Sequence, residues 1–404
     1  MNERYSKHFL MNAEDAKDYA VNIVHFFEPG SELLSTEIGD GNINYVFKVW
    51  DKKTGRSLVI KQADKFLRSS GRPLDLNHNK IEAEMLKIEN DLVPNWVPKV
   101  YHYSDVMCAM SMEDISAFKN LRTEMLEGKT FKNFAGEISS FLVDSLLPTT
   151  DLVIDRAVKK ERVKFFTNIE LCDITEDLVF TEPYYNYKNR NVITPGNEEF
   201  VEKVLYGDEK LKAEVGTLRD MFMNHAQALI HGDLHSGSIF INDTGIKVID
   251  PEFAFYGPMG YDIGNVIGNL FFAWANRAFT KPCDTAFISW ISKAISDIFD
   301  MLIEKLDKKF DEIVTFPLYN KYFKKRYISD VLADSAGCAG TEMVRRVVGD
   351  SKVLEVTCVK DNNVRVPMER ALINMGVRLI KERRNYTHGS QIIDEFQEIL
   401  KKQM

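Results

Sequence analysis

The segment HGDLHSGSIF, residues 231–240, places Asp233 between two of the eight histidines of the chain and close to two glycines. Because glycine allows sharp backbone turns, Gly232 and Gly237 predict a constrained loop. Such loops often present functional groups, so Asp233 is the first candidate for a functional carboxylate. The two flanking histidines are expected to brace the loop through hydrogen bonds rather than to carry protons.

Regular structure is expected on both sides of this loop. A long helix over 213–230 should precede it. The runs SIFI (238–241) and IKVID (246–250) follow it and are separated by the turn signal NDTG, so they predict two short strands of a hairpin. The second strand should end at Asp250, and Glu252 follows two residues later. A hairpin of this kind would bring these two carboxylates to the loop.

A cluster of Asp233, Asp250 and Glu252 would repel itself unless a positive charge lies within it. Mg²⁺ is the natural candidate, because this hard cation prefers carboxylate oxygens and substrate phosphates. The three residues alone also allow a purely structural interpretation. In that interpretation Asp233 caps a turn, and Asp250 with Pro251 ends a strand.

The first part of the chain predicts a small antiparallel sheet with a helix on it. Short runs rich in Val, Ile, Phe and Tyr alternate with turn residues such as GDGN and DKKTGR. The strand-like runs are ELLSTEI (32–38), NYVFKVW (44–50), SLVIKQA (57–63), PKVYHYSD (98–105) and VMCAMSMED (106–114). Amphipathic helices are expected over 13–27 and over HNKIEAEMLKIEN (78–90).

Helical periodicity dominates the rest of the chain. It is clear in AGEISSFLVDSLL (135–147), CDTAFISWISKAISDIFDMLIEKL (283–306) and MERALINMGVRLIKERRN (368–385). A β-rich segment ahead of a larger helical one predicts an α+β fold with two lobes. We expect an N-terminal lobe over 1–115 and a C-terminal lobe over 116–404.

Composition narrows the possible partners and location. The 404 residues are 45% apolar and 28% charged, with a net charge of −8 and no long basic run. This balance argues against nucleic acid, which requires clustered Lys and Arg. The first residues lack the apolar core of a signal peptide, and no apolar run is long enough to span a bilayer. The five cysteines are scattered without a C-x-x-C pair, which favours the reducing cytoplasm.

Further residues predict phosphate binding. The turn in IGDGNINYVFKV contains Gly39 and Gly41, whose backbone N–H groups could cover phosphates, although a plain hairpin would read the same way. Lys61 lies inside the strand-like run VIKQA, and Glu82 or Glu84 of the next helix could pair with it. A loop, a strand lysine, a helix glutamate, an H-x-D loop and a D-x-E turn follow one another in the order found in kinase-like phosphotransferases.

The segment HGDLHSGS resembles the catalytic loop of the aminoglycoside phosphotransferase and choline kinase superfamily, which has a bilobal protein-kinase-like fold. Ser238 stands where that superfamily usually has a metal-binding Asn, and the second motif reads DPEFAFYGPMGYDIGN. Both features resemble the 5-methylthioribose kinase family of methionine salvage. The blocks GDGNINYVFKV, VIKQA, MEDIS, FTNIELCDITEDLVFTEP and AGTEMVRR agree with this family, so the resemblance covers nearly the whole chain.

The resemblance implies ATP-dependent phosphorylation of 5-methylthioribose at its anomeric 1-hydroxyl, with Mg²⁺, by a cytoplasmic homodimer. It also implies a role for each matching residue. These are Asp233 as base at the substrate, Asp250 and Glu252 on Mg²⁺ and ATP, Asn44 and Lys61 on the ATP phosphates, Glu113 and Ile115 on adenine, and Arg345 and Arg346 on the substrate. Because neighbours on a helix point about 100° apart, we expect one arginine on the substrate and the other on a carboxylate, such as that of the Asp233 loop.

One loop departs from the family pattern. The family often has Trp before Pro in the loop after the lysine strand, whereas SSGRPLDLN has Arg72 before Pro73. Other activities also stay open. The same fold could phosphorylate an aminoglycoside, choline or another sugar, or could bind nucleotide without catalysis. A protein kinase fits less well, because the H-R-D, D-F-G and A-P-E motifs are missing.

Overall fold

The computed structural model describes residues 3–38, 44–64 and 76–404. The chain packs into two compact units. Unit 1 consists of Met1–Phe118 with a return segment, Lys247–Ala254, and unit 2 consists of Lys119–Ile246 and Phe255–Met404. The predicted boundary after residue 115 stays a prediction, whereas the division by packing follows Phe118 and assigns the return segment to unit 1.

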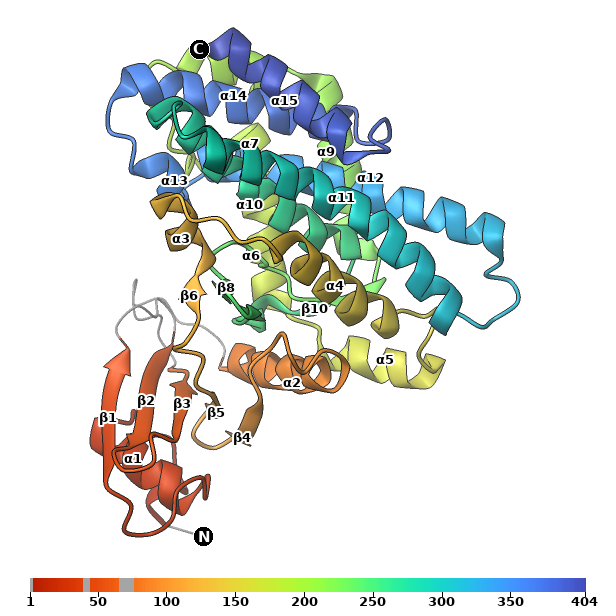
Figure 1. The fold of residues 1–404 in the computed structure, drawn as a ribbon. Helices are drawn as coiled ribbons and strands as arrows, with labels where there is room; N and C mark the ends of the chain where they lie inside the picture. Colours follow the sequence, from red (N-terminus) through yellow and green to blue (C-terminus); the bar gives the residue numbers. More distant parts are fainter. Residues whose placement is uncertain (1–2, 39–43, 65–75) are drawn as a thin grey trace. The chain divides into compact units, whose positions relative to one another are not determined.

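Unit 1 contains an antiparallel sheet in which the strand order is β1-β2-β3-β5-β4 (Figure 1). The strands are β1 (Leu33–Ile38), β2 (Tyr45–Asp51), β3 (Ser57–Gln62), β4 (Val100–Ser104) and β5 (Ala109–Glu113). From Leu58 onward every residue of β3 is buried, because β3 is the central strand and both of its faces are covered. Lys61 therefore lies in the interior of the unit and is not an edge lysine that reaches solvent.

Two helices pack on this sheet, α1 (Ala13–Asn22) and α2 (Asn77–Leu92). A capping box at Asn12 starts α1, because its side chain accepts hydrogen bonds from the N–H groups of Glu14 and Asp15. The helix ends earlier than the expected residue 27. His25 has a left-handed φ of 53°, which a helix cannot accommodate, and Phe27 packs into the core beyond it. The return segment adds the short helix η4 (Pro251–Phe253), which packs on α2.

Unit 2 is mostly helical (Figure 1). Its helices are α3 (Leu121–Glu127), α4 (Phe134–Leu146), η2 (Leu147–Thr149), α5 (Arg156–Phe165), α6 (Ile169–Phe180), α7 (Glu182–Tyr185), α8 (Glu198–Val201), η3 (Glu202–Tyr206), α9 (Glu209–Asn224), α10 (Met259–Thr280), α11 (Thr285–Ile313), α12 (Lys321–Val348), α13 (Leu354–Thr357), α14 (Asn362–Lys381) and α15 (Gly389–Gln403). Its short strands are β6 (Lys119–Asn120), β7 (Ala228–Ile230), β8 (Ile239–Asn242) and β10 (Phe255–Gly257), while β9 (Gly245–Val248) carries the chain into the return segment. The helical segment that follows a small antiparallel sheet confirms the α+β class.

The central helix of unit 2 is α10, in which every side chain from Met259 to Ala278 is buried. It packs closely on α12 because Gly260, Gly264 and Gly268 face that helix at intervals of one turn. A Cβ atom built on Gly264 would lie 2.6 Å from the backbone nitrogen of Ala339. These glycines therefore bring the α10 and α12 backbones together and fix the position of α12.

The expected long helix over 213–230 is wrong at its C-terminal end. Helix α9 ends at Asn224, and Ala228–Ile230 forms strand β7, which pairs antiparallel with β10. A continuous apolar run such as Ala-Leu-Ile has no period that distinguishes a strand from a buried helix. Pairing with β10 makes this run a strand, and β10 lies more than twenty residues further along the chain. The predicted hairpin strands are present as β8 and β9, although β9 ends at Val248 rather than Asp250.

No helix within residues 3–38, 44–64 and 76–404 combines the length and the apolar character that crossing a bilayer requires.

Candidate active site

The loop that carries Asp233 is anchored in unit 2 by a buried carboxylate. The N–H groups of His231 and Gly232 donate to the two oxygens of Asp262, at 2.6 and 3.0 Å. Burial raises the pKa of Asp262, while His231 and the two backbone donors act in the opposite direction. Gly232 has a φ of 82°, which confirms the sharp turn expected there. Asp262 was not among the residues predicted to be functional, although it lies in the block DPEFAFYGPMGYDIGN.

The two histidines brace the loop, as expected. The N–H of Gly237 donates to Nδ1 of His235 at 3.0 Å, so Nδ1 acts as an acceptor. In a neutral imidazole the proton then resides on Nε2, which lies 3.5 Å from Oδ2 of Asp233. Burial lowers the pKa of His235 to about 4, despite the opposing charge of Asp233. His231 accepts the N–H of Asp233 at 3.3 Å.

Both arginines reach Asp233, which corrects the expectation that only one would. The Nη2 atoms of Arg345 and Arg346 lie 3.3 and 3.5 Å from the same oxygen, Oδ1. Burial raises the pKa of Asp233, but the positive charges of His235, Arg346 and Arg345 outweigh burial and hold it far below its usual range. The two arginines are therefore among the charges that keep Asp233 ionised.

A second layer of side chains fixes the same loop. Nδ2 of Asn120 donates to the carbonyl of Gly237 at 2.7 Å, and Nε of Arg122 donates to Oγ of Ser236 at 3.2 Å. The hydroxyl of Ser238, which replaces the usual superfamily Asn, donates to the Asp233 carbonyl at 3.3 Å. Ser238 is thus engaged with the backbone of the loop. These contacts depend on tertiary structure and gave no signal in the sequence.

Unit 1 holds a second charged cluster around Lys61. Its ammonium lies 2.8 Å from the carboxylate of Glu82 and 2.6 Å from that of Asp250. Glu82 is therefore the partner, whereas Glu84 lies on the surface of α2 and pairs with Lys87 at 2.6 Å. Burial lowers the pKa of Lys61, but Asp250 and Glu82 outweigh burial and raise it well above its usual range, so the side chain stays charged.

The turn that carries Asp250 and Glu252 is strained. Asp250 has a φ of 65°, a left-handed conformation that non-glycine residues adopt at a cost of about 1–3 kcal/mol. Oε2 of Glu252 lies 3.4 Å from Nδ2 of Asn44, whose Oδ1 lies 3.3 Å from the His78 ring. Unit 1 therefore brings together four of the residues expected at ATP and Mg²⁺: Asn44, Lys61, Asp250 and Glu252.

The donor set of this turn fits Mg²⁺. Asp250 and Glu252 offer hard carboxylate oxygens two residues apart, and the Asp250 side chain is 43% exposed. Mg²⁺ usually takes one or two carboxylates and completes its shell with waters and phosphate oxygens. Among the residues that the structure describes, no group of three or more His, Cys, Asp and Glu could form an all-protein metal cage.

The two residues expected at adenine lie at the end of β5. The N–H of Glu113 donates to the Lys99 carbonyl at 2.8 Å, so this donor is committed to the sheet. The carbonyl of Ile115 accepts the N–H of Phe118 at 2.8 Å. Neither contact tests a role at adenine. Gly39, Gly41, Arg72 and Pro73 lie outside the described residues.

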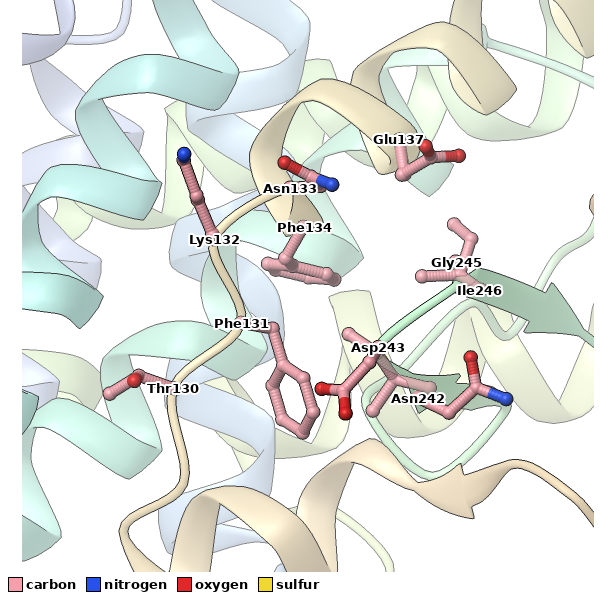
Figure 2. A pocket seen from close by; sticks show the side chains of 11 residues that line it. Thr130, Phe131, Lys132, Asn133, Phe134, Glu137, Asn242, Asp243, Gly245 and Ile246 are labelled. Atoms are coloured by element: carbon pink, nitrogen blue, oxygen red, sulfur yellow. The ribbon is translucent and has the colours of Figure 1, made fainter.

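A cavity of about 220 Å³ lies elsewhere in unit 2, between the start of α4 and the turn that joins β8 to β9. Figure 2 shows Phe131 and Phe134 on one side of it and Asn242 and Asp243 on the other. None of its lining residues is among the residues expected at substrate or nucleotide. The candidate functional residues are therefore the charged side chains of the two units and not the lining of this cavity.

Comparisons with known proteins agree with this chemistry. Residues 166–288 match the model of the phosphotransferase enzyme family. The methylthioribose kinase of Bacillus pumilus is 33% identical over 379 residues, which covers 93% of this chain and 94% of that protein. The methylthioribose kinase of Enterobacter sp. is 34% identical over 386 residues, covering 93% and 95%. The chain belongs to the methylthioribose kinase family. It is therefore a kinase.

Solved structures are less similar to the chain. The ethanolamine kinase of Plasmodium vivax is 13% identical, with a TM-score of 0.47, and the match covers 100% of this chain and 94% of that chain. The choline kinase of Cryptosporidium parvum is also 13% identical, with a TM-score of 0.47 and coverages of 95% and 98%. Membership of the methylthioribose kinase family rests on the sequence relatives and not on these structures.

Proposed function

We propose that the protein transfers the γ-phosphoryl group of ATP to the anomeric 1-hydroxyl of 5-methylthioribose, which gives 5-methylthioribose 1-phosphate and ADP in methionine salvage. The observation that carries this proposal is the ionised Asp233 with two arginines on one oxygen. The relatives named methylthioribose kinase supply the acceptor. We also propose that the enzyme works as a homodimer in the cytoplasm, as the family resemblance implies.

Asp233 would hold the acceptor hydroxyl and take its proton late in the reaction. Its pKa lies far below the usual range, so it is a weak base before the transfer begins. Phosphoryl transfer has a loose transition state that gains more from positioning and charge than from early deprotonation. We therefore assign Asp233 chiefly to orienting the hydroxyl, with Oδ2 as the accepting oxygen because Oδ1 already faces both arginines.

The arginine pair and the unit 1 cluster have separate proposed roles. Arg345 and Arg346 carry fixed positive charge, which stabilises negative charge that develops on the transferring group. Lys61, held by Glu82, would bind ATP phosphate oxygens together with Asn44. Asp250 and Glu252 would hold Mg²⁺, which neutralises phosphate charge when bound. Glu113 and Ile115 would offer backbone groups to adenine.

The nature of the acceptor follows from charge. A cationic acceptor such as choline or an aminoglycoside would lie beside two guanidinium groups, and the carboxylates that face them are already paired. A neutral, hydroxyl-rich acceptor is compatible with them, and an apolar pocket would take the methylthio group. ADP release should therefore be measured with Mg-ATP and 5-methylthioribose, ribose, choline or kanamycin. Turnover with choline or kanamycin and not with 5-methylthioribose would refute the assignment.

The variant Asp233→Asn tests the role of the carboxylate. It keeps the shape of the side chain but removes the charge and the proton acceptor, so kcat should fall about 10²- to 10⁴-fold. The Kd for ATP, measured by isothermal titration, should stay unchanged. Asp243→Asn is the matched control, because Asp243 is an exposed aspartate in the turn after β8. Near-normal turnover of Asp233→Asn would remove Asp233 from this role.

A further inference from the structure

We propose that Glu342 is a positioning residue for phosphoryl transfer, which holds the guanidinium groups of Arg345 and Arg346 together on one oxygen of Asp233. This inference rests on the proposed function. It deepens that function by assigning a role to the buried glutamate of the AGTEMVRR block, to which sequence analysis gave none.

Glu342 has both carboxylate oxygens engaged and is 0% exposed. Oε2 accepts a hydrogen bond from Nε of Arg345. Oε1 accepts one from Nε of Arg346 at 3.0 Å and another from Nδ2 of Asn269 on α10, also at 3.0 Å. One carboxylate thus holds both arginines and is itself fixed by the neighbouring helix.

Helix geometry explains why such an anchor is needed. Side chains at positions 345 and 346 diverge by about 100° around α12. Residue 342 lies three and four positions before them, which places it on the same face between the two. Because Glu342 takes the Nε of each guanidinium, the Nη2 atoms of both turn towards Oδ1 of Asp233. Without such an anchor, two adjacent arginine side chains on a helix would diverge and would not meet at one oxygen atom.

The charges balance within this group. Burial raises the pKa of Glu342, but Arg345 and Arg346 outweigh burial and bring it down to about 2, so Glu342 is ionised at neutral pH. Two carboxylates then face two guanidinium groups. The arginines can bind a transferring phosphoryl oxygen through their Nη atoms while Nε remains on Glu342, so the anchor does not compete with the substrate.

Other groups also act on Asp233. They are His231 and His235 of its own loop, Glu342, Arg345 and Arg346 of α12, Asp262 of α10 and Arg122 of α3. Tyr261 of α10 is neutral, because burial raises its pKa well above the usual range. Of these, only the two arginines are held by Glu342. If they move away, Asp233 loses two of the charges that lower its pKa, so that pKa rises.

The test is Glu342→Gln in the full chain, assayed with Mg-ATP and 5-methylthioribose across pH 5 to 9. An amide can accept at only one of its two ends, so one arginine loses its anchor. We expect kcat to fall about 10- to 100-fold, as for other residues that orient a functional group. The KM for Mg-ATP should stay at the wild-type value. The pH profile is compared in Glu342→Asp, because Glu342→Gln also removes a negative charge that repels Asp233 and raises its pKa.

Glu369→Gln is the matched control. Glu369 on α14 is 1% exposed and accepts from Nε of Arg365, four positions before it, at 2.8 Å. Its other donors are Thr194 and Asn197, so it shares the burial and the pairing of Glu342 but belongs to a different network. The control should lose thermal stability and keep the wild-type kcat. Equal kcat in the two variants would overturn the inference.

A second variant covers the case in which Glu342→Gln does not fold. Glu342→Asp keeps the charge but is one methylene shorter, so it cannot reach both Nε atoms. It should fold and still show reduced kcat, and the acid side of its kcat profile should move to higher pH, because Asp233 loses an arginine that lowers its pKa. Wild-type behaviour would refute the positioning role. The proposed function fails separately. If the wild-type enzyme does not turn over 5-methylthioribose, that function falls and this inference with it, whereas an active wild type with an unaffected Glu342→Asp removes only Glu342.

Discussion

At the residue scale, the charged groups Asp233 and Lys61 each have partners that fix them within their own unit. Asp233 faces two arginines, and Lys61 faces Glu82 and Asp250. A buried charge is costly unless it is paired, and removing one partner leaves the other uncompensated. Replacement of one partner in such a pair should therefore destabilise the protein much more than replacement of both partners.

The Lys61 pair gives a testable consequence of this kind. Lys61→Met leaves Glu82 buried without its cation, which should lower the free energy of unfolding by about 3–5 kcal/mol. The double variant Lys61→Met/Glu82→Gln should recover part of that loss but no activity. Lys87→Met is the control, because its surface pair with Glu84 is worth less than about 1 kcal/mol. Urea denaturation measures all three.

The loss in Lys61→Met should depend on pH. Without the lysine, burial leaves the folded-state pKa of Glu82 above its unfolded value, so the folded state takes up a proton more readily. Stability then increases as pH falls, and the deficit against wild type should be smaller at pH 5.5 than at pH 8. A deficit that grows as pH falls would contradict this account.

Candidate site residues could be selected from the sequence where residue type and order point to them. Asp233, Lys61 and the D-x-E turn were all selected as candidates from such signals, and their roles stay predictions. Asp262 and Glu342 were missed, because each acts through hydrogen bonds to a loop or helix that only the fold brings near. The partner of Lys61 stayed open for the same reason, since the choice between Glu82 and Glu84 depends on how α2 is rotated against β3.

At the element scale, the arginines are placed by the packing of α12 on α10. Gly264 of α10 faces the backbone of α12, so Gly264→Ala would force the two helices apart. We expect a loss of about 1–3 kcal/mol from overpacking, together with reduced kcat because α12 carries Arg345 and Arg346. Thermal melts and the ADP-release assay measure the two effects.

Gly216→Ala is the control for that prediction. Gly216 lies in α9, and a Cβ built on it meets nothing within 4 Å. Alanine there should stabilise the helix by about 0.5–1 kcal/mol and leave kcat unchanged, because it reduces the freedom of the unfolded chain. If both alanine variants shifted the melting temperature in the same direction, helix propensity would explain the results and close packing would not.

Local sequence patterns predict some of the helices and strands but not all of their ends. The strands of unit 1 were predicted because turns and β-branched runs alternate there. The end of α9 was not, because Ala228–Ile230 becomes a strand only through its pairing with β10. The end of α1 was also missed, since nothing in the local pattern requires the left-handed turn at His25.

At the scale of the whole molecule, the chain completes unit 1 only after it has built much of unit 2. The return segment enters unit 1 through Lys247, which donates to the carbonyl of Val97 at 3.0 Å and lies 3.2 Å from the Glu113 carboxylate. The N–H of Val248 donates to the Trp96 carbonyl at 2.7 Å. No composition change marks this segment, which is why the sequence predicted a simple division into two consecutive lobes.

The return segment therefore predicts a local effect of Lys247→Met in the full chain. The substitution leaves the Val97 carbonyl without its buried donor, which should cost about 1–3 kcal/mol. Hydrogen exchange should become faster in β4 and β5 of unit 1 and stay unchanged in α10 of unit 2. Lys293→Met, which removes an exposed lysine that pairs with Asp297 on α11, should change neither. Equal acceleration in both units would mean that they unfold together, because the loss in unit 1 would then be shared by the whole chain.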